Sequence, residues 1–148
     1  MYKKEINTTP LFPIRKAAEI VGVSIPTIRM YEREGLILPK KSAGNQRQYS
    51  EADIERLRCI RNTINNDKIS IKGMKRILSL IPCWEILPCS DADREKCQAY
   101  YDHLGPCWSY IHEGTTCAGR DCSSCAVYSN FADCHGIKNS IKNISKNQ

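Results

Sequence analysis

Eight of the nine cysteines in this 148-residue chain fall within the 52 residues from Cys83 to Cys134. Little helical or alternating apolar periodicity accompanies them, so this segment cannot assemble a large apolar core of its own. Segments of this kind are held together by metal ions or by cross-links. The sequence therefore predicts a small, metal-stabilised cysteine-rich domain at residues 82–136, followed by a polar tail at 137–148.

The cellular compartment decides whether metal ions or disulfide cross-links are favoured. No apolar run approaches the roughly 18 residues that a membrane span needs, and Met1–Lys4 lead into no apolar signal core. We therefore expect a cytoplasmic protein. Cytosolic reductants keep thiols reduced, which favours metal binding or redox chemistry over structural disulfides, although disulfides remain an alternative as a switch.

The spacing of the last cysteines suggests one metal centre. Thiolates are soft ligands that suit zinc or an iron–sulfur cluster. The run Cys117-x4-Cys122-x2-Cys125 places three sulfurs within reach of one centre, and plant-type ferredoxins share this local spacing. A fourth ligand could come from Cys134, Cys107 or elsewhere.

The earlier cysteines form either a second four-thiolate site or a redox reserve. All eight are candidate ligands: Cys83, Cys89, Cys97, Cys107, Cys117, Cys122, Cys125 and Cys134. His103, His112 and His135 are expected to be solvated, although His135 adjoins Cys134 and could replace it.

The first half of the chain, unlike the second, has the apolar periodicity of helices, and its beginning predicts two short ones. Apolar residues on one face of the first helix recur every three or four positions: Ile14, Ala17, Ala18 and Val21. Gly22 ends this helix, Ser24 is placed to cap a second one, and Gly35 closes that. Two short helices joined by a glycine turn predict a helix-turn-helix.

A hairpin and two more helices are expected to follow. Residues 36–49 predict a small β-hairpin with its tip at Ala43–Asn45, because Gly and Asn tolerate the positive φ of tight turns. Ser50 and Asp53 resemble a capping box that starts a helix. Its apolar stripe is Ile54, Leu57, Ile60 and Ile64. A last helix capped by Ser70 ends before Pro82, which we take as the domain boundary.

Charge separates the same two halves. Residues 1–81 carry 16 Lys/Arg against 8 Asp/Glu, whereas residues 82–148 carry 6 against 8. A basic half joined to a mildly acidic one indicates that the first half meets a polyanion, unless its cations merely solvate the surface.

Three runs in the basic half resemble one family. They are Ala17-Ala18-Glu19-Ile20-Val21-Gly22-Val23-Ser24, Thr27-Ile28-Arg29-Met30-Tyr31-Glu32-Arg33-Glu34-Gly35-Leu36 and Arg47-Gln48-Tyr49-Ser50. From Phe12 to about Leu80 the chain resembles the MerR family of bacterial regulators. The resemblance implies a mainly α fold, with a flexible leader at residues 1–11 and a winged helix-turn-helix at 12–81.

The resemblance also implies what the protein does. We expect a transcription regulator without catalytic activity that binds double-stranded DNA sequence-specifically as a homodimer, with RNA polymerase as a candidate further partner. Most family members dimerise through a long helix after the winged domain. Here Pro82 and the cysteine segment replace that helix, so pairing would use another part of the chain.

Six side chains are candidates for DNA binding. A helix over about Ser24–Glu34 projects Thr27, Arg29 and Arg33 away from the core side. The resemblance implies that Arg29 and Tyr31 approach the DNA backbone, and that Arg47 and Tyr49 of the wing grip a neighbouring phosphate. Tyr31 has an equal alternative as a core aromatic. The operator cannot be read, because Pro26, Met30 and the wing run Asn45-Gln46-Arg47 depart from the family pattern.

The cysteine-rich half also resembles a known module, the two-CW domain, through its pairs Cys83-Trp84 and Cys107-Trp108. Regulators of the MerR family commonly place a sensing cysteine cluster after the DNA-binding part, which tilts the choice slightly from zinc towards an iron–sulfur cluster. Regulation would then act through a metal- or redox-responsive domain. The rival hypotheses are an iron–sulfur electron carrier and a structural zinc adaptor that docks a protein partner. Cys59 is expected to point away from the buried stripe, either at a subunit contact, which we favour, or as a thiol without a role.

Overall fold

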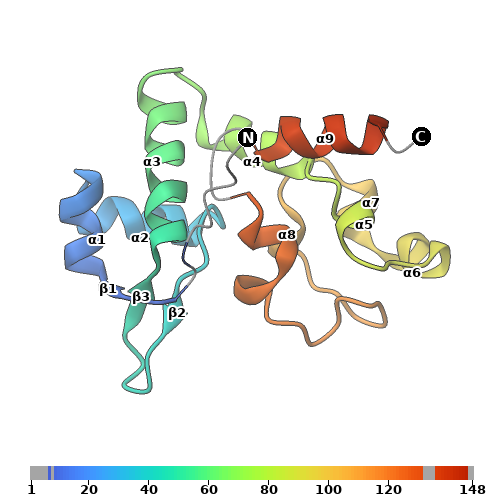
Figure 1. Ribbon diagram of the computed structural model, residues 1–148, viewed down its shortest axis with the longest axis horizontal. Helices are drawn as coiled ribbons and strands as arrows, with labels where there is room; N and C mark the ends of the chain where they lie inside the picture. The colour runs from blue at the N-terminus through green and yellow to red at the C-terminus, as the bar shows by residue number, and fades with distance from the viewer. Residues whose placement is uncertain (1–6, 8, 132–135, 147–148) are drawn as a thin grey trace.

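The computed structural model describes Asn7 and residues 9–131 and 136–146, and shows a mainly helical chain (Figure 1). Helices α1 (Ile14–Val21) and α2 (Ile25–Arg33) form the predicted helix-turn-helix. Gly22 ends α1 in the left-handed region at φ 78°, a conformation that glycine adopts without steric cost. The Ser24 hydroxyl caps α2 by accepting a hydrogen bond from the Thr27 N–H at 3.2 Å, as predicted.

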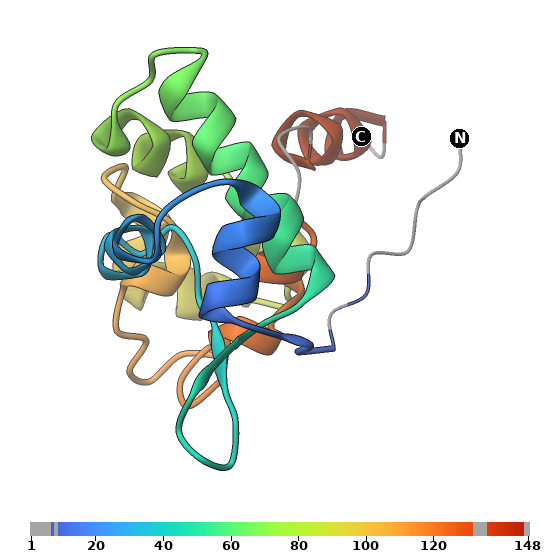
Figure 2. The same ribbon diagram turned by 90° about the vertical axis from the view of Figure 1, so that its left-hand side faces the viewer.

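The wing is part of a small antiparallel sheet, with three strands among the described residues in the order β1-β3-β2. β2 (Lys40–Lys41) and β3 (Arg47–Tyr49) form the predicted hairpin, and Asn45 turns its tip at φ 60°. Figure 2 shows this hairpin extending away from the helices.

Strand β1 (Phe12–Pro13) pairs with β3 and was not predicted. The Leu11 N–H also donates to the Tyr49 carbonyl at 3.0 Å, so the end of the predicted leader is hydrogen-bonded to the wing. Two paired residues are too few to show an alternating pattern, which explains why the sequence did not reveal this strand.

Helices α3 (Glu51–Asn65) and α4 (Ile71–Ser79) complete the predicted winged domain. The capping box at the start of α3 is confirmed: the Ser50 hydroxyl accepts from the Asp53 N–H, and the Asp53 carboxylate accepts from the Ser50 N–H. Ser70 caps α4 through the Gly73 N–H.

The cysteine-rich half consists of short turns of helix. They are α5 (Cys83–Ile86), α6 (Asp91–Lys96), α7 (Gln98–Tyr101), the 3-10 turns η1 (Cys107–Ser109) and η2 (Cys122–Ser124), and α8 (Ala126–Ser129). Helix α9 (Gly136–Lys146) follows and gives the tail a regular structure.

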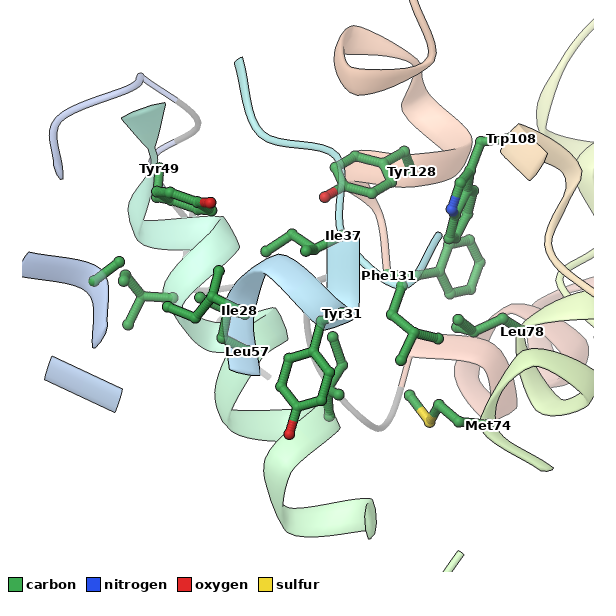
Figure 3. Packing of buried hydrophobic residues seen from close by; sticks show 14 of the residues in the cluster. Ile28, Tyr31, Ile37, Tyr49, Leu57, Met74, Leu78, Trp108, Tyr128 and Phe131 are labelled. Carbon is green, nitrogen blue, oxygen red and sulfur yellow. The ribbon is translucent and has the colours of Figure 1, made fainter. Parts of the chain in front are cut away.

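One hydrophobic core crosses the predicted boundary at Pro82 (Figure 3). Trp108, Val127, Tyr128 and Phe131 join a cluster whose other members include Ile28, Leu57, Met74 and Leu78 of the winged domain. The cysteine-rich half lacks the apolar residues for a core of its own, so it packs these four side chains against the winged domain.

Candidate nucleic-acid interface and thiol cavity

Helix α2 presents a basic face to solvent. Arg29 and Arg33 are exposed, and Thr27 is half-buried with its hydroxyl 2.7 Å from that of Ser24. The two arginines are four positions apart, so they lie about one turn apart on one side of the helix. This face has the cations and the hydroxyl that the sequence assigned to DNA binding.

An ion pair connects α2 with the wing. The Arg47 Nε lies 2.5 Å from a carboxylate oxygen of Glu32, and the two side chains are 39% and 22% exposed. The hydrogen bond and the negative charge of Glu32 raise the pKa of Arg47. The ion pair therefore holds the wing beside α2, so that the exposed side chains of both share one surface.

The two tyrosines assigned to DNA contact are buried (Figure 3). Tyr31 is 3% exposed and Tyr49 is 0% exposed. Burial, followed by the charge of Glu32, raises the pKa of Tyr49 to about 12. Its hydroxyl has no hydrogen-bond partner among the residues that the structure describes. Tyr31 serves as a core aromatic here, and phosphate contacts by both tyrosines stay predictions.

Two side-chain contacts connect the helix-turn-helix to the next two helices, α3 and α4. Lys75 of α4 pairs with Glu34 at the end of α2, with 2.6 Å between Nζ and Oε2. Arg61 of α3 donates to the carbonyl of Val21, the last residue of α1, at 2.9 Å. These contacts fix α2 to α4 and α1 to α3.

The seven described cysteines of the second half line one cavity, whose volume is about 40 Å³. They are Cys83, Cys89, Cys97, Cys107, Cys117, Cys122 and Cys125, and all seven are free thiols. Cys134 and His135 lie outside the described residues. Trp84, Trp108, His112 and Tyr128 complete much of the lining.

The thiols of Cys83 and Cys107 interact directly with each other. The Cys83 thiol hydrogen-bonds with the Cys107 thiol, which lowers the pKa of Cys83 to about 7 and raises that of Cys107. The negative charges that Cys122 and Cys125 would carry raise the pKa of Cys107 further. Cys83 and Cys107 line the same cavity as Cys122 and Cys125, and Cys107 is one of the fourth ligands that the sequence offered for that group. Within the described part of the chain, no three His, Cys, Asp or Glu side chains form a group that could hold a metal ion as the structure stands.

Two other expectations need correction. His112 is half-buried rather than solvated, because its Nε2 lies 2.8 Å from the Cys107 carbonyl and its Nδ1 lies 3.8 Å from the Cys97 sulfur. Cys59 does not point away from the apolar stripe: it packs against the core and is disulfide-bonded. The contacts of His112 come from residues 5 and 15 positions earlier, and Cys59 is drawn in by the core.

Three residues join the two halves, and of these the sequence had noted only Trp108. Trp108 Nε1 donates to the Gly35 carbonyl at 2.7 Å. The Tyr128 hydroxyl accepts from the Leu38 N–H at 2.8 Å and donates to an Asp53 carboxylate oxygen at 3.3 Å. The Arg56 guanidinium donates to the carbonyls of Tyr128 and Phe131. The Cys-Trp repeat was the one sequence signal that pointed to any of them.

No helix within residues 9–131 and 136–146 is both long enough and apolar enough to cross a membrane.

Residues 12–81 match the sequence profile of a family described as "MerR HTH family regulatory protein". The chain is 40% identical over 72 residues to the "Putative heat shock protein HspR" of Streptomyces coelicolor, which covers 49% of this chain and 48% of that protein. It is 41% identical over 68 residues to a "Probable heavy metal-dependent transcriptional regulator" of Haemophilus influenzae, covering 45% and 52%. A Bacillus anthracis "HTH-type transcriptional regulator GlnR" is 30% identical over 76 residues, covering 51% and 58%. The chain thus spans about half the length of these relatives.

Proposed function

We propose that this chain, whose residues 12–81 form a MerR-family helix-turn-helix domain, is a transcription regulator that binds double-stranded DNA sequence-specifically. Regulators of this family are DNA-binding transcription factors and not enzymes, as the sequence led us to expect. The observation that carries the proposal is the surface that α2 and the wing share. On it, Arg29 and Arg33 are exposed and the Glu32–Arg47 ion pair holds the wing against the helix.

The exposed sides of α2 and the wing fit the major groove and the neighbouring backbone of a double helix. Helix α2 would enter the major groove, with Thr27 near the base edges and Arg29 and Arg33 at the phosphates. Arg47 of the wing would reach the neighbouring backbone. Two copies related by a two-fold axis would read two half-sites, since one winged domain contacts too few base pairs for high specificity. RNA polymerase is the further partner that we propose for such a complex.

The thiol cavity is proposed as the regulatory site, and its ligand as a thiophilic metal ion. Seven thiols around one small cavity offer the soft donors that zinc and heavier ions prefer. A change of χ1 brings a cysteine sulfur part of the way to an ion, and the short segments that carry the thiols move to complete the coordination. The iron–sulfur cluster gains no support from the relatives, whereas the one from Haemophilus influenzae is named a heavy metal-dependent regulator and one from Pseudomonas fluorescens a mercuric resistance operon regulatory protein.

A salt titration tests DNA binding. Full-length protein is titrated into a fluorescent random-sequence 30-bp duplex, and into duplexes selected from a random library, at several salt concentrations. We expect affinity to fall steeply with salt, because bound phosphates release counterions. Arg29→Glu should weaken binding about tenfold or more on every duplex and flatten the salt slope by about one.

The matched control is Lys96→Glu, which changes the net charge equally on exposed α6, far from α2 in Figure 1. It should leave DNA affinity close to that of the unaltered protein. Equal losses in both variants, or binding that ignores salt, would contradict the proposed function.

A further inference from the structure

Two aromatic residues of the cysteine-rich half lie against the elements proposed to read DNA. Trp108 is 8% exposed and Tyr128 is 4% exposed, and their rings meet edge to face with 5.1 Å between centroids (Figure 3). Neither residue belongs to the winged domain, yet each hydrogen-bonds to its backbone. Their positions therefore connect the two functions proposed above.

Trp108 holds the end of the recognition helix. Its indole N–H donates to the Gly35 carbonyl at 2.7 Å, and Gly35 is the residue that turns the chain out of α2 at φ 73°. The next residue, Ser109, is so close that a Cβ on Gly35 would lie 2.9 Å from its hydroxyl oxygen. Any shift of η1 must consequently move the end of α2 or break this contact.

Tyr128 holds the base of the wing. Its hydroxyl accepts from the Leu38 N–H, just before β2, and donates to Asp53. The same carboxylate caps α3 through Ser50, so one phenol joins the wing to the capping box. The Arg56 guanidinium stacks on the ring, 3.8 Å from its centroid, which fixes the ring in place.

Both aromatic residues also line the thiol cavity. Trp108 directly follows Cys107, and Tyr128 lies in α8, whose N-cap is Cys125. Helix α8 contacts both α5, which begins with Cys83, and η2, which begins with Cys122. A ligand that draws these thiols together has only one or a few peptide units between it and the two aromatic rings.

We infer that Trp108 and Tyr128 are positioning residues that transmit the occupancy of the thiol cavity to α2 and the wing. The inference rests on the proposed function and adds the contacts through which the thiol cavity would regulate DNA binding. When a thiophilic divalent ion pulls Cys107 and Cys125 together, the two rings move, and the Gly35 and Leu38 segments move with them. The angle between the recognition helix and the wing then changes.

The test measures a ratio of affinities. The Kd for a selected duplex is determined on reduced full-length protein, first with a chelator and then with one equivalent of ZnCl₂, and zinc affinity is measured separately. We expect zinc to change the Kd about fivefold or more in the unaltered protein, the lower range of couplings between sites. In Tyr128→Phe and Trp108→Phe this ratio should fall towards one while zinc still binds.

The control variant is Tyr110→Phe, which removes a hydroxyl that hydrogen-bonds to Asp102 within the cysteine-rich half. It should keep the zinc-dependent ratio. A purely structural role for Trp108 and Tyr128 would alter the Kd with and without zinc by the same factor, and that result would overturn the inference. No effect of zinc in the unaltered protein would overturn it as well, whereas failure to bind any duplex would instead remove the proposed function.

Discussion

Glu32 of α2 and Arg47 of β3 form an ion pair, 2.5 Å between carboxylate oxygen and Nε, that fastens the wing to the recognition helix. The pair places a negative charge on the surface proposed to meet phosphates. Because both side chains are partly exposed, its own contribution to stability is small, up to about 1 kcal/mol. The effect of this carboxylate on DNA binding should therefore exceed its effect on folding.

Glu32→Gln should strengthen binding to random-sequence duplex a few-fold, since it removes one repulsion from the phosphates and releases Arg47 to pair with them. Fluorescence anisotropy at low and moderate salt checks this. The control is Glu55→Gln, which opens the more exposed Glu55–Arg58 pair of α3, where the separation is 2.8 Å. Weaker binding of Glu32→Gln would show that fixing the wing matters more than the charge.

Arg56→Ala should destabilise the fold strongly. Arg56 is 4% exposed, and its removal takes a donor from both carbonyls: Tyr128 keeps the Phe131 N–H at 3.4 Å, whereas the Phe131 carbonyl loses its Arg56 hydrogen bond. An unsatisfied buried polar group costs about 1–3 kcal/mol, so the loss should reach about 3 kcal/mol. Urea unfolding measures it, with Arg58→Ala on the exposed side of the same helix as control, expected within about 0.5 kcal/mol. Equal losses would mean that Arg56 does not join the two halves.

Gly35→Ala should cost more stability than Gly119→Ala. Both glycines have left-handed backbones, at φ 73° and φ 70°, so each alanine pays about 1–2 kcal/mol for conformation. Only at Gly35 would the new Cβ meet a neighbour, the Ser109 hydroxyl at 2.9 Å, whereas nothing lies within 4 Å at Gly119. Thermal unfolding of both variants separates the two costs, and Ser109→Gly should relieve the excess. An identical loss at the two sites would show that η1 is not pressed against the end of α2.

Tyr49 should make stability depend on alkaline pH. Burial raises its pKa from the ordinary value of 10.0 to about 12 in the folded chain. Between these values the unfolded chain has lost the phenolic proton while the folded chain retains it, so stability falls as pH rises from about 10 to about 12. Tyr49→Phe should remove this part of the pH dependence in urea unfolding under reducing conditions. Below pH 9 it should leave stability unchanged or raise it, because the hydroxyl has no partner among the described residues. An unaltered pH profile in Tyr49→Phe would assign the effect to other tyrosines.

The sequence by itself determined the local elements of the winged domain. Ser24, Ser50 and Ser70 cap their helices through backbone groups three residues away, and Gly22 ends α1 by its own conformation. Such signals act within about one helical turn, so they can be read directly from the order of residues. The thiol-rich composition of the second half and the basic charge of the first were equally evident.

Only the tertiary structure decided how these parts meet. Trp108 is 73 positions from Gly35 in the sequence, and Arg56 is 75 positions from Phe131. Strand β1 pairs with β3, although α1 and α2 lie between them in the sequence. The burial of Tyr31 and Tyr49 was also decided by the tertiary structure, as was the position of Cys83 on the same cavity as Cys122 and Cys125. Contacts over such separations depend on which apolar faces pack together, and a segment with too few apolar residues for its own core leaves no periodic pattern from which its packing could be read.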